Sequence, residues 1–230
     1  MLFRSIRLSH VIQSGHYGYP SLYLNFTGES LPPLKDYGGG SGCGAMYFQD
    51  LRWPEPYADA LYTCDWGTST VYRHNLPVNG ATFDAHQEVF LKLPRPTDMD
   101  VDGSGRLYVT SWKNGKFNFS GPNVGFVTQV TPVGFTPKPF KPLYYTSEAS
   151  LLGYLSSPSA VHRLHSQREL VRRGKGTARI AGLSGLTANS KAPLYGRIAA
   201  IYTLKQILGA DSNAALLKLL DDASDRKSVV

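Results

Sequence analysis

Cysteine is scarce in this chain of 230 residues, which has only Cys43 and Cys64. Their spacing fits neither a zinc site nor the Cys-x-x-Cys-His attachment site of a c-type haem. A zinc site built on cysteines and a covalently bound haem are therefore excluded within these residues. A disulfide between Cys43 and Cys64 is one reading, in an oxidising compartment. Two free thiols are the other, and we favour them.

Long apolar runs are also lacking. No window of the sequence approaches the roughly 20 apolar residues that a membrane-spanning helix needs. The first ten residues, MLFRSIRLSH, lack the apolar run of a secretory signal. We therefore expect no transmembrane segment and no signal peptide in this chain.

Charge and proline are unevenly distributed. The net charge is +7, but residues 1–150 carry 12 basic and 12 acidic side chains, whereas residues 151–230 carry 12 and 5. Fourteen of the 15 prolines precede residue 160. Such a change in composition after the proline-rich stretch 131–142 indicates a domain boundary. We predict one domain over residues 1–145 and a second over residues 146–230.

Short segments with a period of two residues dominate the first part of the chain. Alternating apolar and polar residues predict strands, here over residues 44–49, 60–66, 70–74, 82–93, 98–101, 106–112 and 125–131. Residues 5–20 predict a short strand or turn that leads into a loop. Residues 21–42 end in GGGSG, and we expect an irregular connector there.

An internal repeat links these strands. The segments ALYTCDW at 60–66 and RLYVTSW at 106–112 are alike and lie about 45 residues apart. A period of this length with several short strands in each repeat is typical of a β-propeller. Propellers close with typically four to eight blades, and this chain holds about two. We therefore expect a piece of a longer protein.

A calcium loop is suggested by Asp98, Asp100, Asp102 and Gly103, which occupy positions 1, 3, 5 and 6 of an EF-hand pattern. The bidentate glutamate required at position 12 would be residue 109, which is Val109. The acids are better explained by a tight turn between two strands, DGSG at 102–105. We predict no calcium at this turn.

After residue 150 the period changes to that of helices. Ser157 and Pro158 predict a helix start, with Val161, Leu164 and Val171 on its apolar face and Gly174 as its end. A short helix is predicted over residues 177–187. A longer helix is predicted to begin near Ser190 and to end at Gly209, with Ile198, Ile201, Leu204 and Leu208 on its apolar face. A last helix is predicted to begin at Asp211 or Ser212. Short helices in pairs are typical of a HEAT-type solenoid. The fold class that we predict for the whole chain is therefore β plus α. It consists of a partial propeller of about two four-stranded blades, followed by HEAT-like repeats.

Three stretches resemble a known family. They are HYGYP at 16–20, the glycine-rich lead into residues 44–49, and RPTDMDVDGSGRLYV at 95–109. They resemble the last blades of glucose/sorbosone dehydrogenase-type quinoprotein propellers. The following stretch 155–174 is similar to the start of the HEAT-like part of large bacterial proteins named membrane-bound dehydrogenases. In those proteins a c-type haem domain comes after the helices.

The resemblance implies a cofactor site at four residues. Tyr17 and Tyr19 would lie in the loop whose aromatic rings border pyrroloquinoline quinone, and Arg95 and Asp98 in the loop that faces its carboxylates. A planar tricarboxylate suits arginine and aromatic partners. The chain departs from the family at Tyr19, where a tryptophan is expected, at Thr97, where a second arginine is missing, and at Asp65 and Trp66, where a lysine is expected.

The catalytic histidine and the calcium ligands of the family belong to earlier blades, and the histidines at 10, 16, 74 and 86 match no such motif. We therefore assign no catalytic residue and no metal ligand in this chain. The resemblance implies a full-length protein of the periplasm or cell envelope that oxidises a sugar or an alcohol and passes electrons to its haem domain. Its partners would be the remaining blades and that domain. We predict that this chain alone is inactive.

Two other functions remain open. A propeller with HEAT-like repeats can act as a non-catalytic scaffold that binds protein partners. The basic cluster Arg163, Arg168, Arg172, Arg173, Lys175 and Arg179 could bind nucleic acid electrostatically. No recognition fold accompanies this cluster, so we favour a solvated helix face over a nucleic-acid site.

Overall fold

The computed structural model of the chain describes residues 5–17, 28, 30–113, 124–220 and 222. It contains several small antiparallel sheets and a set of helices, and the described strands form no closed barrel. Two compact units are present. One comprises Met1–Tyr47, Ala60–Asp100 and Tyr108–Gln129, and the other comprises Phe48–Asp59, Val101–Leu107 and Val130–Val230.

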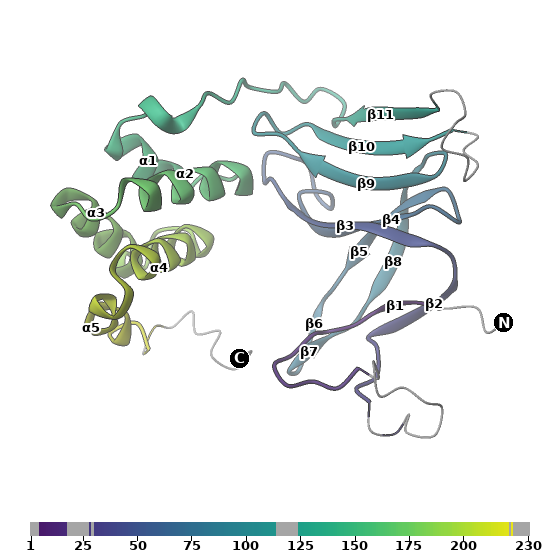
Figure 1. The fold of residues 1–230 in the computed structure, drawn as a ribbon, viewed down its shortest axis with the longest axis horizontal. Coiled ribbons are helices and arrows are strands. Elements are labelled where there is room, and N and C mark those ends of the chain that lie inside the picture. Colours follow the sequence, from purple (N-terminus) through teal and green to yellow (C-terminus); the bar gives the residue numbers. More distant parts are fainter. Residues whose placement is uncertain (1–4, 18–27, 29, 114–123, 221, 223–230) are drawn as a thin grey trace. The chain divides into compact units, whose positions relative to one another are not determined.

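Eleven strands are present in the described residues. They are β1 (Ser5–Leu8), β2 (Lys35–Gly39), β3 (Gly42–Gln49), β4 (Asp59–Asp65), β5 (Thr70–Asn75), β6 (Val78–Asn79), β7 (Thr82–Phe83), β8 (His86–Lys92), β9 (Pro96–Val101), β10 (Leu107–Trp112) and β11 (Gly125–Val130). They form a four-stranded sheet of order β3-β4-β5-β8, a three-stranded sheet β11-β10-β9 and the pairs β1-β2 and β6-β7 (Figure 1).

Each of the seven stretches predicted as strands contains a strand, but two expectations, one about a connector and one about a strand, need correction. The connector expected over residues 21–42 contains strand β2, which pairs with β1 in antiparallel register. The fourth strand predicted over residues 82–93 is divided, since β7 turns back onto β6 before β8 begins. Both additional pairs consist of few residues rich in glycine or polar side chains, which carry little alternation for sequence reasoning to detect.

The four-stranded sheet is built around Tyr62. Strand β4 buries alternate residues, and its Tyr62 and Cys64 have no exposed surface. Strands β5 and β8 pair with a register shift between Val71 and Tyr72, and Phe90 of β8 lies edge-on to Tyr62 with a centroid distance of 4.9 Å. The alternation predicted for this sheet therefore places aromatic rings in its core.

The acidic turn between β9 and β10 is held by its own hydrogen bonds. One oxygen of Asp102 accepts from the backbone nitrogens of Ser104, at 2.8 Å, and Arg106, at 3.0 Å, and from the hydroxyl of Ser104 at 2.6 Å. Gly105 has φ of +90°, a conformation in which glycine has no side-chain clash. The turn explanation of these acids is thus confirmed. No group of three potential metal ligands occurs in the described part of the chain.

Five α-helices follow the strands within the described residues. They are α1 (Glu148–Tyr154), α2 (Ala160–Arg173), α3 (Thr177–Ala188), α4 (Leu194–Leu208) and α5 (Asn213–Leu217), with short 3-10 turns at Leu143–Tyr145 and Gly209–Ser212. Gly174 and Gly209 end α2 and α4 with positive φ, as predicted. Two expectations are wrong: α1 has no counterpart among the predicted helices, and α2 begins after Ser159 rather than after Ser157.

The buried faces of α2 and α4 differ from the prediction. Leu164 and Ile198 are exposed, while the helical core consists of leucines and one alanine: Leu143, Leu151, Leu155, Leu170, Leu183, Ala200 and Leu204. One arginine of each helix, Arg163 and Arg197, is buried as well. No described helix is long and apolar enough to cross a membrane.

One buried arginine near the start of each of three helices bonds back to the segment before it. Arg163 of α2 donates to the carbonyl oxygen of Ser157 at 2.6 Å, Arg179 of α3 donates to that of Gly174, and Arg197 of α4 donates to that of Thr187 at 3.1 Å. The carbonyl groups at a helix C-terminus have no partner within their own helix. These arginines therefore join successive helices, and they recur 16 to 18 residues apart.

The second unit also includes the loop 48–59 and the turn 101–107, which contact α2. His162 of α2 donates to the carbonyl oxygen of Gly103 at 2.7 Å, and Trp53 of the loop donates to that of Gly105 at 2.8 Å. A side chain at Gly103 would collide with the ring of Phe140. Burial lowers the pKa of His162, so His162 holds the turn in its neutral form.

Candidate functional site

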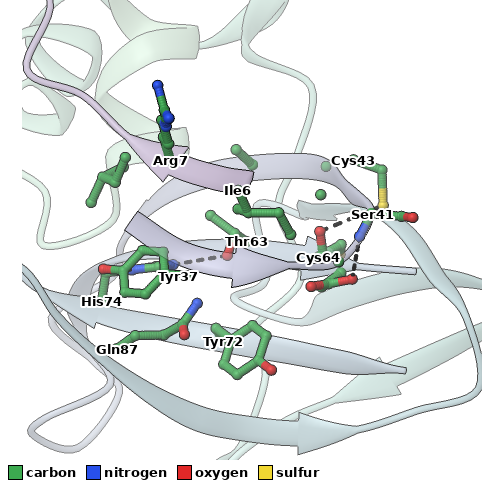
Figure 2. A pocket seen from close by; sticks show the side chains of 16 residues that line it. Ile6, Arg7, Tyr37, Ser41, Cys43, Thr63, Cys64, Tyr72, His74 and Gln87 are labelled. Atoms are coloured by element: carbon green, nitrogen blue, oxygen red, sulfur yellow. Dashed lines mark hydrogen bonds between the residues drawn. The ribbon is translucent and has the colours of Figure 1, made fainter. Parts of the chain in front are cut away.

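A hollow of about 480 Å³ lies in the first unit, over the strands β3, β4 and β5 (Figure 2). Residues of β1 and β2 form another wall. The lining combines apolar side chains with hydroxyl, thiol, imidazole, amide and carboxylate groups: Ile6, Arg7, Leu8, Tyr37, Ser41, Cys43, Ala45, Thr63, Cys64, Asp65, Tyr72, His74 and Gln87 contribute side chains. A mainly apolar hollow with a few polar groups is typical of a small-ligand site.

His74 forms the centre of a hydrogen-bonded chain at one end of this hollow. Its Nδ1 lies 3.2 Å from the hydroxyl of Tyr37, and its Nε2 lies 2.8 Å from the hydroxyl of Thr63. Burial lowers the pKa of His74 to about 4 and raises that of Tyr37. His74 is therefore neutral at pH 7, so one ring nitrogen donates and the other accepts. Two hydrogen bonds therefore link the three side chains across the hollow.

The two cysteines lie on adjacent strands at the other end of the hollow, and both are free thiols. Cys43 is exposed, and its thiol donates to the carbonyl oxygens of Pro96 at 3.1 Å and Cys64 at 3.5 Å. Cys64 is fully buried, and burial raises its pKa to about 12. A thiol with such a pKa is no nucleophile. The hollow thus offers hydrogen-bonding groups rather than an activated cysteine.

Asp65 lines the hollow and joins two turns. It is buried, and one of its oxygens accepts from the backbone nitrogens of Ser41 at 2.9 Å and Thr68 at 3.1 Å. These bonds hold the turn before β3 beside the turn after β4. The other oxygen lies against Gly40, where a Cβ atom would be only 2.4 Å away. Gly40 is therefore required by a close approach that the sequence did not reveal.

Arg95 lies at the end of the sheets where the loops 93–95 and 66–69 meet. Its guanidinium carbon is 3.9 Å from the centroid of the Trp66 ring, and Trp66 is 6.2 Å from Trp112. Among the described residues no carboxylate pairs with this guanidinium. Arg95 has φ of +44°, which is rare for a residue with a side chain and often marks functional positions.

The other residues that the resemblance places at the quinone are Tyr17, Tyr19 and Asp98. Asp98 is exposed on β9, and its carboxylate accepts from the adjacent backbone nitrogen of Met99. Tyr17 uses its hydroxyl locally, accepting from the nitrogen of Ile12 at 2.7 Å and donating to the oxygen of His10 at 2.9 Å. Tyr19 lies outside the described residues. Tyr17 thus bonds to residues 10 and 12, and Asp98 bonds to the next residue. Neither of these hydrogen bonds links the side chain to Arg95.

Most of the basic cluster on the helices serves internal contacts. Arg163 and Arg179 are buried, Arg173 donates to Glu169 and to the carbonyl oxygens of 143, 144 and 146, and Lys175 pairs with Asp211. Glu169 accepts from Arg172 as well, and that bond above all lowers its pKa to about 2. Only Arg168 of the cluster has no partner among the described residues. Arg168, Arg172 and Lys175 are exposed, as expected for a solvated face, whereas Arg163 and Arg179 are buried and Arg173 is half-buried.

Sequence reasoning missed the central residues of the hollow. In the sequence His74 stands out only as a histidine that matches no family motif, and Tyr37 falls in a stretch expected to be an irregular connector. The two residues are 37 positions apart and meet only because β2 folds beside the sheet. No local pattern signals a contact of that kind.

No protein-family profile matches the chain. No curated protein matches it either. One solved structure, of a Thermus thermophilus protein described as an oxidoreductase (glucose dehydrogenase), is similar with a TM-score of 0.39 and 19% identity over 52% of this chain. The match spans 34% of that protein's length, about a third.

Proposed function

We propose that residues 42–130 form two consecutive blades of a quinoprotein-like propeller of the glucose/sorbosone dehydrogenase type, and that a HEAT-like helical segment follows. The repeated segment on β4 and β10 is the observation that carries this proposal. It places Trp66 and Trp112 at the same point of the two repeats, with their rings in contact. Equivalent residues of neighbouring repeats meet in this way when the repeats stack around one axis.

The loops at one end of the sheets support the same proposal. Trp66 donates its backbone nitrogen to Ser41 at 2.9 Å, and Leu93 donates to Ser69 at 3.2 Å. The turn before β3, the turn after β4 and the connection into β9 therefore gather at one end. Loops that a rigid sheet brings together commonly build a binding site, and Arg95 belongs to this group of loops.

The described residues fit a quinone only in part. When bound, pyrroloquinoline quinone with calcium would accept the electrons of the substrate. Arg95 has a guanidinium suited to one of its carboxylates, whereas Asp98 would repel them and Tyr17 is engaged with its own turn. No described group of three ligands is suited to calcium. We therefore derive no catalytic step from this chain.

The fuller account concerns the longer protein. We propose that this chain is a piece of a protein of the periplasm or cell envelope, whose other blades complete the ring and whose c-type haem domain receives electrons from a sugar or an alcohol. The 16 to 18 residue spacing of Arg163, Arg179 and Arg197 supports a repeated helical unit after the propeller.

Incubation with the cofactor tests the proposal. The purified chain is mixed with pyrroloquinoline quinone and calcium, passed over a desalting column and assayed for a bound chromophore and for dye reduction with glucose or ethanol. We expect no dye reduction, because Arg95 alone cannot supply the base and the metal ligands that turnover needs. Dye reduction that survives desalting and requires Arg95, as judged with Arg95→Met, would contradict our proposal that the chain is inactive alone.

A non-catalytic scaffold is the second candidate. It is favoured by the incomplete fit to a quinone and by the position of β11 at the edge of its sheet. Binding of a protein segment without any quinone binding would select this candidate over the first.

A further inference from the structure

Side chains from four strands surround the hollow of about 480 Å³ (Figure 2). Thr63 of β4 lies opposite Tyr72 of β5, and His74 of β5 lies opposite Gln87 of β8. Opposite residues of a ladder point to the same face of the sheet, and so do residues two positions apart on one strand. Tyr37 of β2 covers this face, because its hydroxyl bonds to His74. A space of this volume is within the range of small-ligand sites.

The hydrogen-bonded chain Tyr37–His74–Thr63, called the His74 chain below, has one hydrogen to spare. The two hydroxyl groups and the neutral imidazole carry one hydrogen each, and the two hydrogen bonds use two of these three. If Nε2 of His74 carries the ring hydrogen, the hydroxyl hydrogen of Thr63 is left over; if Nδ1 carries it, that of Tyr37 is left over. Neither hydroxyl has a further partner among the described residues. In both tautomers one O–H donor is therefore available to the hollow.

Gln87 adds unused N–H donors beside the His74 chain. Its side chain lines the hollow, and its carboxamide makes no hydrogen bond to any residue that the structure describes. A carboxamide carries two N–H donors and one acceptor oxygen. A ligand group that meets these O–H and N–H donors must accept hydrogen bonds. A carbonyl oxygen, which has two lone pairs, can accept from both.

The remaining lining is apolar or has its charge already engaged. Ile6 of β1 contributes an apolar side chain. The guanidinium of Arg7 pairs with Asp36 at 3.2 Å. One oxygen of Asp65 accepts from two backbone nitrogens, and the other lies against Gly40. A charged ligand would lose its hydration here without gaining a partner of opposite charge, so the lining favours an uncharged ligand.

We propose that the hollow binds a small uncharged carbonyl compound with an apolar body. Its carbonyl oxygen accepts from the spare hydroxyl hydrogen of the His74 chain and from the carboxamide of Gln87. Its apolar body lies against Ile6 and the ring of Tyr72. This site does not depend on the proposed quinone, because Arg95 does not line the hollow.

Three probes with the same phenylethyl body test the class of ligand. They are the uncharged ketone benzylacetone, the anion hydrocinnamate and the cation phenylpropylammonium. Each probe is titrated into the ¹⁵N-labelled chain while the amide resonances are followed. For the ketone we expect saturable shifts at residues 63 and 72–74 and at the side-chain amide of Gln87, with a Kd of about 1 mM, which is typical of so small a ligand. Both ions should bind at least about tenfold more weakly.

Two matched variants locate the site. Gln87→Met keeps the length of the side chain but removes its donors, so it should weaken ketone binding about fivefold. His86→Met is the control, because His86 is exposed and its side chain points to the other face of β8; it should leave binding unchanged. Unchanged circular dichroism shows that each variant still folds. Equal effects of the two variants, binding of either ion as tight as that of the ketone, or no saturable shifts at the named residues would overturn the proposal.

Discussion

Acidification should destabilise the first unit through His74. The ring is 2% exposed, both of its nitrogens have hydroxyl partners, and burial lowers its pKa to about 4. In the unfolded chain a histidine has a pKa of about 6.5. As the pH falls from about 6.5 to 4, the unfolded state binds a proton that the folded state does not. Stability is therefore fully present above about pH 6.5 and falls toward pH 4.

The size of this effect follows from the two pKa values. A difference of about 2.5 units corresponds to at most about 3.4 kcal/mol. The ring of His74 borders an open hollow, so solvent reduces the penalty for charging it. We expect the free energy of unfolding to fall by about 2 kcal/mol between pH 7.5 and 4.5 because of this residue alone.

Urea unfolding at several pH values measures the effect, with His74→Gln as the matched variant. Glutamine retains hydrogen-bonding groups toward Tyr37 and Thr63 but does not titrate. Between pH 7.5 and 4.5 the unmodified chain should lose about 2 kcal/mol more stability than the variant. The variant also corrects for His162, whose pKa is lowered by burial in the second unit. Identical pH profiles for the two chains would refute the assignment of His74 as a buried neutral group.

Further predictions concern the helices, the turn and the thiols. Arg179→Met should lower the free energy of unfolding by about 3 kcal/mol, because it leaves the Glu148 carboxylate and a helix-end carbonyl without a partner. The control variant Arg168→Met should change it by less than about 0.5 kcal/mol. Equal losses for the two variants in urea unfolding would contradict this prediction. Asp102→Ala should cost about 1–2 kcal/mol, since three donors in the turn lose their acceptor; an unchanged melting temperature would contradict it. Iodoacetamide at pH 8 should alkylate the exposed cysteine, Cys43, and spare the buried one, as mass spectrometry of tryptic peptides would show; equal labelling would contradict the burial of the second thiol.

Strands and helix ends that depend on local patterns were predictable from the sequence. The alternation in 60–66 and 106–112 predicts β4 and β10, and the glycines at 174 and 209 predict the ends of α2 and α4. Strand β2 was missed because Gly38 and Gly39 provide no alternation of side chains. Helix α1 was missed because it has only seven residues, although Ser147 caps its start.

The candidate site was less predictable, because it depends on contacts between distant residues. The pairing of Tyr37 with His74 needs β2 to fold beside the sheet, and the ring contact of Trp66 with Trp112 needs two repeats to stack. The arginines illustrate the same limit. Sequence reasoning treats the basic cluster as exposed charge, but its members Arg163 and Arg179 are buried. Carbonyl groups between and at the ends of helices accept their hydrogen bonds.

The size of the natural polypeptide tests the central claim most directly. An antibody raised against this chain is used to probe extracts of cells that carry its gene, and the same band is stained for covalent haem. We expect a band several times heavier than the 25.2 kDa of these 230 residues, with haem staining, in the envelope fraction. A single band near 25 kDa without haem would contradict our proposal that two blades and a few helices belong to a larger dehydrogenase-type protein.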